Sequence, residues 1–253
     1  MELFHTEKTR AISVATEYLG LSGKEREIIT GTDKENKPWQ YWGLDEKDNP
    51  ISTKNGTDKL YWTEALQRVP VFLERSGMSY EHLLDLLATM FINPEGSIEV
   101  QFPTPASEEE STITSSCDIE RAVIATTEPD DTFNKIHRFM RWQRKTSWSI
   151  QEFDKVIRVL AWQDLDDDVI IATRYLRQLQ AEMRVPLNEL LSWYAKIDTA
   201  RGAKGEPSFY EQLFLNRTVL RPVDEKFKLN KDRDDLAVNS DPEKNKECAE
   251  QNS

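Results

Sequence analysis

The segment from Gly77 to Pro94 combines more helix signals than any other stretch, and it constrains the fold most. Ser79 is a typical N-cap, because its hydroxyl oxygen accepts a hydrogen bond from a free amide of the first turn. Apolar residues then recur at the spacing of one helix face: Leu83, Leu84, Leu87, Met90 and Phe91, with Leu86 at the margin. Since a proline disfavours helical backbone at the residue before it, Asn93-Pro94 is expected to end this buried helix.

Three other helix starts carry a capping box, in which a serine and a glutamate three residues later each accept from the other's backbone amide. The pairs are Ser22 with Glu25, Ser149 with Glu152, and Ser208 with Glu211. Apolar residues at helical spacing predict further helices over 7–19, 60–73 with a break at Pro70, 130–145, 166–185 and 187–197. The fold class is therefore predicted to be all-α, built from short capped helices with long loops.

Two stretches interrupt the helical pattern. Proline, glycine and aromatic residues break any periodicity over 32–57, which is expected to be a long loop pinned by its aromatic side chains. Proline, serine, threonine and glutamate dominate 96–116, although 98–102 alternates as a short strand does. We therefore expect a helical unit over 1–95, a linker over 96–116, a second helical unit over 117–230, and a disordered polar tail over 231–253.

The charge of the chain restricts its partners. A formal net charge of −12 argues against a general nucleic-acid surface and against binding to anionic membranes, since both require basic patches. No apolar run approaches the ~20 residues of a membrane span, and the first residues lack the pattern of a signal peptide. Cys117 and Cys248 lie in polar stretches and are expected to be free thiols.

Few residues suggest chemistry. His5, His82 and His137 have no second ligand at the spacing of a zinc motif, and lone helical histidines are more simply structural. The acidic cluster Asp164–Asp168 suits a hard cation, but its position at a helix start is equally explained by the helix dipole.

The arginines near Trp142 and Trp148 fit either a single-stranded nucleic-acid patch or, more simply, a solvated helix face. No nucleophile stands beside a base, and there is no glycine-rich phosphate loop. The sequence predicts no catalytic, cofactor-binding or metal-binding residue, and no cofactor.

Several segments in fixed order resemble the A component of the insecticidal toxin complexes, the Tc toxins, and the related virulence-plasmid A proteins. The segments are YLGLSGKEREIITG at 18–31, SYEHLLDLLATMFINPE at 79–95, CDIERAVI at 117–124 with FNKIHRFMRWQRKTSWSIQEFDKVI at 133–157, PLNELLSWYAKIDT at 186–199, and SFYEQLFLNRTVLRPVDEKFKLN at 208–230. Five ordered blocks make a chance likeness improbable.

The resemblance implies a homopentamer in which a helical shell encloses a translocation channel, with a B–C cocoon that carries a toxic enzyme and a receptor on the host cell surface. The matching segments are those of the N-terminal shell, so this chain is expected to be a shell-type segment of a longer, secreted subunit. It is expected to be no enzyme, to bind no nucleic acid, and not to insert into membranes itself. The alternative is a free-standing helical adaptor that binds a partner protein through an exposed apolar groove.

Overall fold

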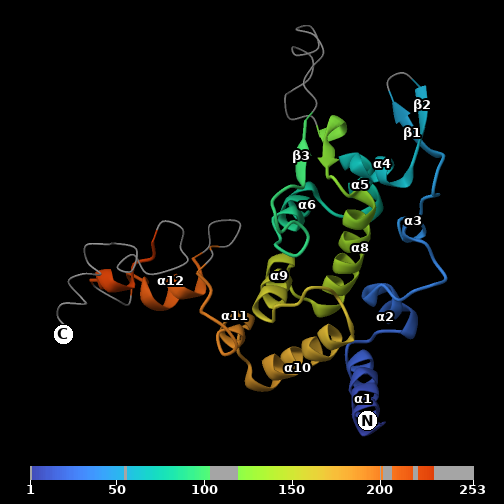
Figure 1. Cartoon of the computed structure of the whole chain (residues 1–253). Coiled ribbons are helices and arrows are strands. Elements are labelled where there is room, and N and C mark those ends of the chain that lie inside the picture. The colour runs from blue at the N-terminus through green and yellow to red at the C-terminus, as the bar shows by residue number, and fades with distance from the viewer. Residues whose placement is uncertain are drawn as a thin grey trace, which may run out of the picture. The chain divides into compact units, whose positions relative to one another are not determined.

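The computed structural model describes residues 2–53, 56–102, 119–199, 201, 207–218 and 222–230. These residues are mostly helical, with two small two-stranded sheets, as Figure 1 shows. The helical class expected from the sequence is therefore confirmed. The chain divides into two compact units, Met1–Leu179 and Gln180–Ser253.

The first unit contains most of the regular structure. In chain order its elements are α1 (Glu2–Tyr18), α2 (Gly23–Thr30), α3 (Pro38–Tyr41), β1 (Asn49–Thr53), β2 (Gly56–Leu60), α4 (Trp62–Gln67), α5 (Val69–Ser76), α6 (Tyr80–Leu87), β3 (Glu99–Gln101), the 3-10 turn η1 (Ile119–Arg121), β4 (Val123–Ala125), α8 (Pro129–Thr146), α9 (Ile150–Val159) and α10 (Asp167–Met183), whose last residues belong to the second unit. The break predicted near Pro70 separates α4 from α5.

Two of the predicted capping boxes begin helices of this unit. At α9, Ser149 Oγ accepts from the Glu152 amide at 3.2 Å, and Glu152 Oε2 accepts from the Ser149 amide at 2.8 Å. Ser22 and Glu25 form the same reciprocal pair at α2. Each box satisfies amides that a helix start otherwise leaves unpaired.

The segment around α6 differs from the prediction in its length and in its buried face. The helix ends at Leu87, because Thr89 turns the chain and its hydroxyl donates to the Leu86 carbonyl at 2.7 Å. Leu86, expected at the margin, is fully buried, whereas Leu84 is 46 % exposed and Met90 is 49 % exposed. The buried face is therefore narrower than predicted.

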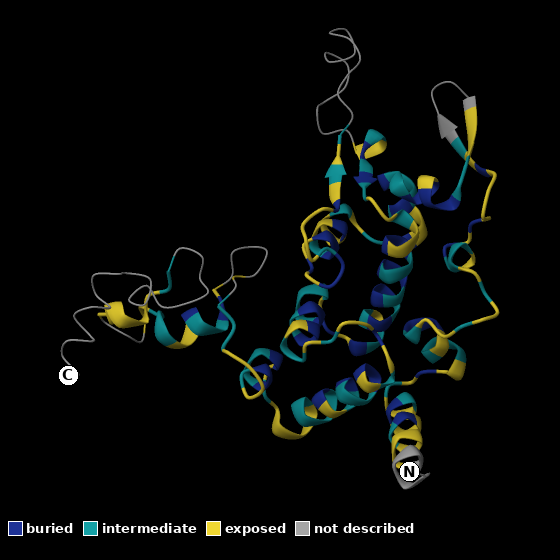
Figure 2. Cartoon of the chain, in the orientation of Figure 1, coloured by how far each residue is buried: buried dark blue, intermediate teal, exposed yellow. Residues whose placement is uncertain are grey.

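The core of the first unit is aromatic and is organised along α8. Phe139 of α8 packs on Phe153 of α9 at 4.9 Å between ring centroids and on Phe91 at 5.8 Å. Nearer the start of the same helix, Phe133 contacts the rings of Trp62 and Phe72. Figure 2 shows the buried positions as a stripe along α8, which the amphipathic spacing of this helix predicts.

Residues 32–57, expected to be a loop, form α3 and most of a β-hairpin in the described part of the chain. Strands β1 and β2 pair antiparallel, with Ile51 opposite Asp58. Asn49 closes the base of the hairpin, since its side-chain amide donates to the carbonyls of Asp45 at 2.8 Å and Leu60 at 3.1 Å. The strand pairing depends on contacts between residues that are separated in the sequence. Local periodicity of the sequence does not reveal such contacts.

The division of the chain also differs from the expected one. Strand β3, the start of the expected linker, pairs antiparallel with β4, with Val100 opposite Ile124. Both sides of 96–116 thus belong to the first unit, and the second unit begins at Gln180. Residues 103–118, which include Cys117, lie outside the described residues.

The second unit contains shorter elements. They are α11 (Leu187–Leu191), α12 (Phe209–Phe214) and the 3-10 turn η2 (Glu225–Phe227). The third capping box begins α12, and its Glu211 also binds the Arg201 guanidinium at 2.8 Å. The helix expected over 187–197 ends at Leu191. The tail 231–253, with Cys248, lies outside the described residues.

Candidate functional site

The two histidines whose side chains the structure describes have different environments. His82 is exposed on α6, and the side chain of His5 lies outside the described residues. His137, by contrast, is only 9 % exposed and stacks on Tyr41, with 4.9 Å between ring centroids and 8° between ring planes. Of the two described histidine side chains, His137 is therefore the buried one.

The acidic cluster before α10 is occupied by contacts within the chain. Asp167 forms a two-point pair with Arg26, and Asp168 pairs with Lys8 at 2.7 Å. Asp166 accepts from the amide of Val169 at 3.0 Å, as an N-cap does. Within the described ranges, no group of three His, Cys, Asp or Glu side chains is arranged to hold a metal ion.

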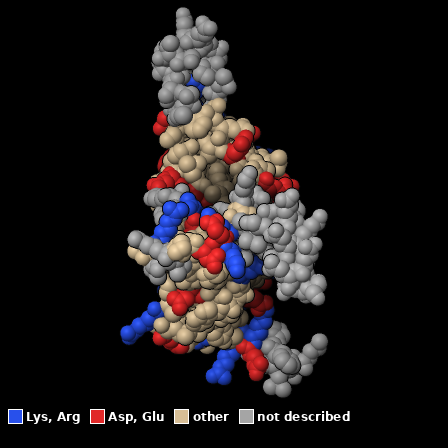
Figure 3. All heavy atoms as spheres, turned by 90° about the vertical axis from the view of Figure 1, so that its left-hand side faces the viewer, with Lys and Arg blue, Asp and Glu red and all other residues tan. Residues whose placement is uncertain are grey.

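The tryptophans near the arginines of α8 are buried. Trp142 is fully buried and Trp148 is 6 % exposed, so neither presents a ring face on which a base could stack. Figure 3 shows both basic and acidic side chains on the face of the molecule that it draws.

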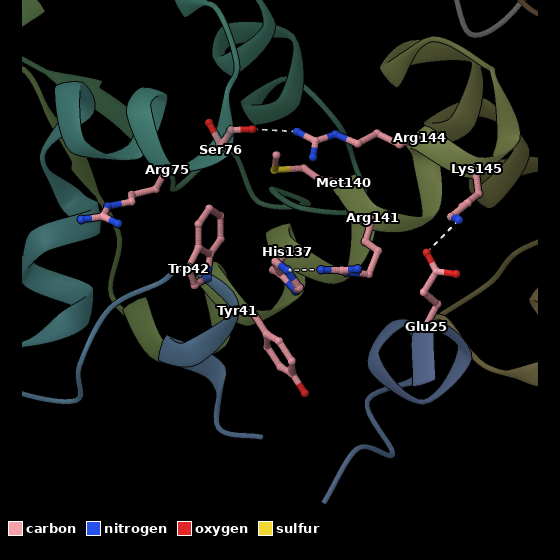
Figure 4. Close-up of a pocket in the computed structure, with 10 residues that line it drawn as sticks. All are labelled: Glu25, Tyr41, Trp42, Arg75, Ser76, His137, Met140, Arg141, Arg144 and Lys145. Carbon is pink, nitrogen blue, oxygen red and sulfur yellow. Dashed lines mark hydrogen bonds and ion pairs between the residues drawn. The ribbon is translucent and has the colours of Figure 1, made fainter. Parts of the chain in front are cut away.

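A pocket of about 270 Å³ lies in the first unit, where α2, α5 and α8 meet the end of α3. Its lining residues are Glu25, Tyr41, Trp42, Arg75, Ser76, His137, Met140, Arg141, Arg144 and Lys145. Half of them come from α8, where their spacing places them on one face of the helix. Figure 4 shows Trp42 and His137 at the centre, with Arg75 on one side and Arg141 on the other.

The floor of the pocket is buried and its rim is charged. Trp42, Ser76 and Met140 are each less than a tenth exposed, whereas Arg75 and Arg144 are exposed. Arg144 donates to the carbonyl of Ser76, the last residue of α5, at 2.7 Å. A cation at this position complements the carbonyls that a helix C-terminus leaves unpaired.

His137 is neutral at physiological pH. Burial, together with the charges of Arg141 and Arg144, lowers its pKa to about 4. Its Nε2 lies 3.5 Å from Nη2 of Arg141, and because a guanidinium only donates, a hydrogen bond here requires the tautomer with the ring proton on Nδ1. A neutral histidine with this pKa is a poor general base near pH 7, and no serine or cysteine nucleophile contacts it among the described residues.

Three buried donors of the pocket side chains have no hydrogen-bond partner within the described part of the protein. They are Nδ1 of His137, Nε of Arg141 and Nε1 of Trp42. A buried donor left unpaired costs about 1–3 kcal/mol. Unpaired buried polar groups are rare in native proteins, and among the described residues Trp62, Trp142, Arg174 and Asn188 each carry one outside the pocket.

The segment that carries Tyr41 is held by Asp33. The carboxylate accepts from Lys24 Nζ at 2.8 Å and from the Tyr41 hydroxyl in a short hydrogen bond. These two contacts, that with Lys24 first, lower the pKa of Asp33 well below its usual range. Because α2 provides Lys24, this contact fixes the aromatic wall of the pocket against α2.

Sequence reasoning found His137 and the arginines of α8 but did not join them to a site. The spacing of His137, Arg141 and Arg144 along α8 does indicate one shared face. Tyr41, Trp42 and Arg75 come from segments far away in the sequence, and no local pattern brings them to that face.

No protein-family model matches the chain, and neither the curated proteins nor the solved structures gave a significant match. No helix among the described residues is both long and apolar enough to cross a membrane.

Proposed function

We propose that this chain is a helical shell segment of the A subunit of a Tc-type toxin complex. Its role is structural: it helps to enclose the pentameric channel through which a toxic enzyme enters the host cell. The proposal rests on the ordered resemblance of five sequence segments and on the helical fold of those that the structure describes. In this proposal the other partners are the B–C cocoon and a host receptor, and the subunit is secreted.

The structural observation that supports the proposal is the exposure of large apolar side chains within the resembling segments. Trp193 and Tyr194, in the segment 186–199, are 50 % and 54 % exposed. Phe227, in the segment 208–230, is 39 % exposed, and Leu213 of α12 is 47 % exposed. Large exposed apolar side chains are typical of surfaces that contact another protein. In an A subunit, the neighbouring shell would cover them.

The pocket supports a structural rather than an enzymatic role. It presents cations and a neutral histidine but no nucleophile paired with a base among the described residues. We therefore propose no catalytic activity for this chain, and a shell-type arrangement of its helices within the larger subunit.

Co-purification tests the proposal. The chain should be co-expressed with the product of a neighbouring reading frame that encodes channel helices, and only one of the two should carry an affinity tag. The expected result is a stable complex that survives gel filtration. A chain that elutes without the channel-helix product would contradict the proposal, and a chain that instead retains an unrelated partner would favour the adaptor alternative.

Two variants locate the contact. Trp193→Glu with Tyr194→Glu places charges on the exposed aromatic positions and should abolish co-purification, because burying an unpaired charge is costly. The matched control is Val14→Glu, which charges an exposed apolar position in α1 of the first unit. Equal retention of the complex by both variants would show that the second unit does not make this contact.

Membrane activity provides an independent test. The purified chain should release no dye from anionic liposomes, since its net charge of −12 is repelled by such lipids. Dye release comparable with that of an intact A subunit would contradict the shell proposal.

A further inference from the structure

The pocket of the first unit has a charge opposite to that of the whole chain. Four of its ten lining residues, Arg75, Arg141, Arg144 and Lys145, are cations, and one, Glu25, is an anion. The complete chain carries 45 acidic residues and a net charge of −12. A local excess of cations in so acidic a protein is not expected from composition.

Three of these four cations have no carboxylate partner within the described residues. Lys145 pairs with Glu25 at 2.7 Å, and this contact lowers the pKa of Glu25. Within the described residues, Arg75 donates to the Gly43 carbonyl at 3.2 Å. In the part of the chain that the structure describes, no carboxylate lies within ion-pair distance of Arg75, Arg141 or Arg144.

Some other arginines of the chain are paired with carboxylates. Arg26 pairs with Asp167, Arg158 with Asp154 at 3.1 Å, and Arg201 with Glu211 at 2.8 Å. Arg75, Arg141 and Arg144 are thus three guanidinium groups, without a carboxylate partner among the described residues, that line one pocket. Each guanidinium has five N–H donors, and one carbonyl contact leaves most of them available.

The side chains between these arginines complete an anion site. His137 and Trp42 each carry a buried N–H without a partner, and so does Arg141 at Nε. The buried floor reduces the screening of charge by water, which strengthens attraction between the arginines and an anion. All of these groups donate, and oxyanions supply acceptors alone.

We propose that this pocket binds a small molecule with at least two negative charges, either a phosphate ester or a polycarboxylate. Arg141 is the central ligand, and Arg75 and Arg144 close the rim. The pocket volume of about 270 Å³ is near the lower end of small-molecule sites, which span roughly 300–1,000 Å³. It suits a compact polar anion and not a polymer. This site is independent of the proposed shell function.

Isothermal titration calorimetry of the purified full chain tests the proposal with two probes, inorganic pyrophosphate for the phosphate class and citrate for the polycarboxylate class. Each titration is matched to a potassium chloride titration at the same ionic strength. The expected result is saturable 1:1 binding of at least one probe, with quenching of tryptophan fluorescence because Trp42 lines the pocket. The probe that binds more tightly identifies the class.

Arg141→Gln should weaken this binding about tenfold or more, since it removes a charge-assisted contact. Arg10→Gln, which changes an exposed arginine of α1, should bind as the wild type does. If Arg141→Gln does not fold, Arg75→Gln at the exposed rim replaces it, with an expected loss of about threefold or more. The proposal is overturned if neither probe binds more tightly than chloride, or if the folded pocket variant binds as tightly as Arg10→Gln.

Discussion

The two units use the same local signal to begin helices but differ in what those helices bury. Ser149 and Glu152 begin α9 in the first unit, and Ser208 and Glu211 begin α12 in the second. In the first unit, α9 places Phe153 in a fully buried aromatic cluster. Among the described residues from Gln180 onward, no aromatic side chain is buried.

This difference shows that the local signal that begins a helix does not determine whether the helix is buried. A capping box satisfies amides within a single turn, so it works wherever the backbone folds locally. Burial of aromatic rings requires neighbouring elements, which α4, α5 and α9 supply to α8 in the first unit. The second unit has the local signals, but its aromatic side chains stay partly exposed, as expected for a surface that a partner covers.

The largest expected effect comes from removing a ring of the first unit's core. Phe139→Ala should lower the free energy of unfolding by about 3–5 kcal/mol, because Phe139 is fully buried between Phe91 and Phe153. Tyr194→Ala in the second unit should change it by less than about 0.5 kcal/mol. Urea melts of both variants measure the contrast, and equal losses would remove the distinction between the units.

Within α6, two leucines sharpen the same contrast on a smaller scale. Leu86→Ala should cost about 2–5 kcal/mol, since Leu86 is fully buried. Leu84→Ala is the matched control and should cost less than about 0.5 kcal/mol, since Leu84 is 46 % exposed. If urea melts showed a larger loss of stability for Leu84→Ala than for Leu86→Ala, the buried helix face would be the one expected from the sequence.

Acid should destabilise the first unit through His137. Its pKa is about 4 in the folded chain against an ordinary 6.5, so the unfolded chain binds a proton first as the pH falls. Stability should therefore decrease between about pH 6.5 and pH 4, by up to about 3 kcal/mol.

His137→Gln is the control for this loss, because glutamine does not titrate. Glu25 and Asp33, whose pKa values are lowered, also lose stabilising contacts in acid, so the difference between variant and wild type isolates the histidine. Denaturation curves at several pH values provide the measurement. Identical slopes for both proteins would show that His137 titrates normally in the folded chain.

The capping boxes should give the smallest effects, and similar ones in the two units. Ser149→Ala and Ser208→Ala should each cost the local helix about 0.5–2 kcal/mol. Combining Ser149→Ala with Glu152→Ala should cost less than the sum of the single changes, because both residues belong to one motif. Amide hydrogen exchange in α9 and α12 resolves each helix, and strict additivity would exclude a coupled cap.

Much of the fold was predictable because its signals are local. The boxes at Ser22, Ser149 and Ser208 begin helices where the sequence indicates, and the break near Pro70 is confirmed. The hairpin of β1 and β2 was missed, since its base is closed by Asn49, which contacts the Leu60 carbonyl of the opposite strand.

The pocket was only partly predictable for the same reason. Three of its basic residues share a face of α8, and that spacing is visible in the sequence. Arg75 and Trp42 reach the pocket only through the packing of α5 and of the end of α3 against α8. The same packing leaves the three buried donors of the pocket without partners, and no sequence pattern predicts this.

Sedimentation velocity across a range of concentrations tests most directly whether the second unit is a contact surface. The mass of the wild-type protein should rise above that of one chain at high concentration, because exposed apolar side chains associate with one another when their partner is missing. The double variant Trp193→Ser with Tyr194→Ser should remain a monomer throughout. A wild type that stays monomeric at every concentration, or a variant that associates as strongly, would contradict the account.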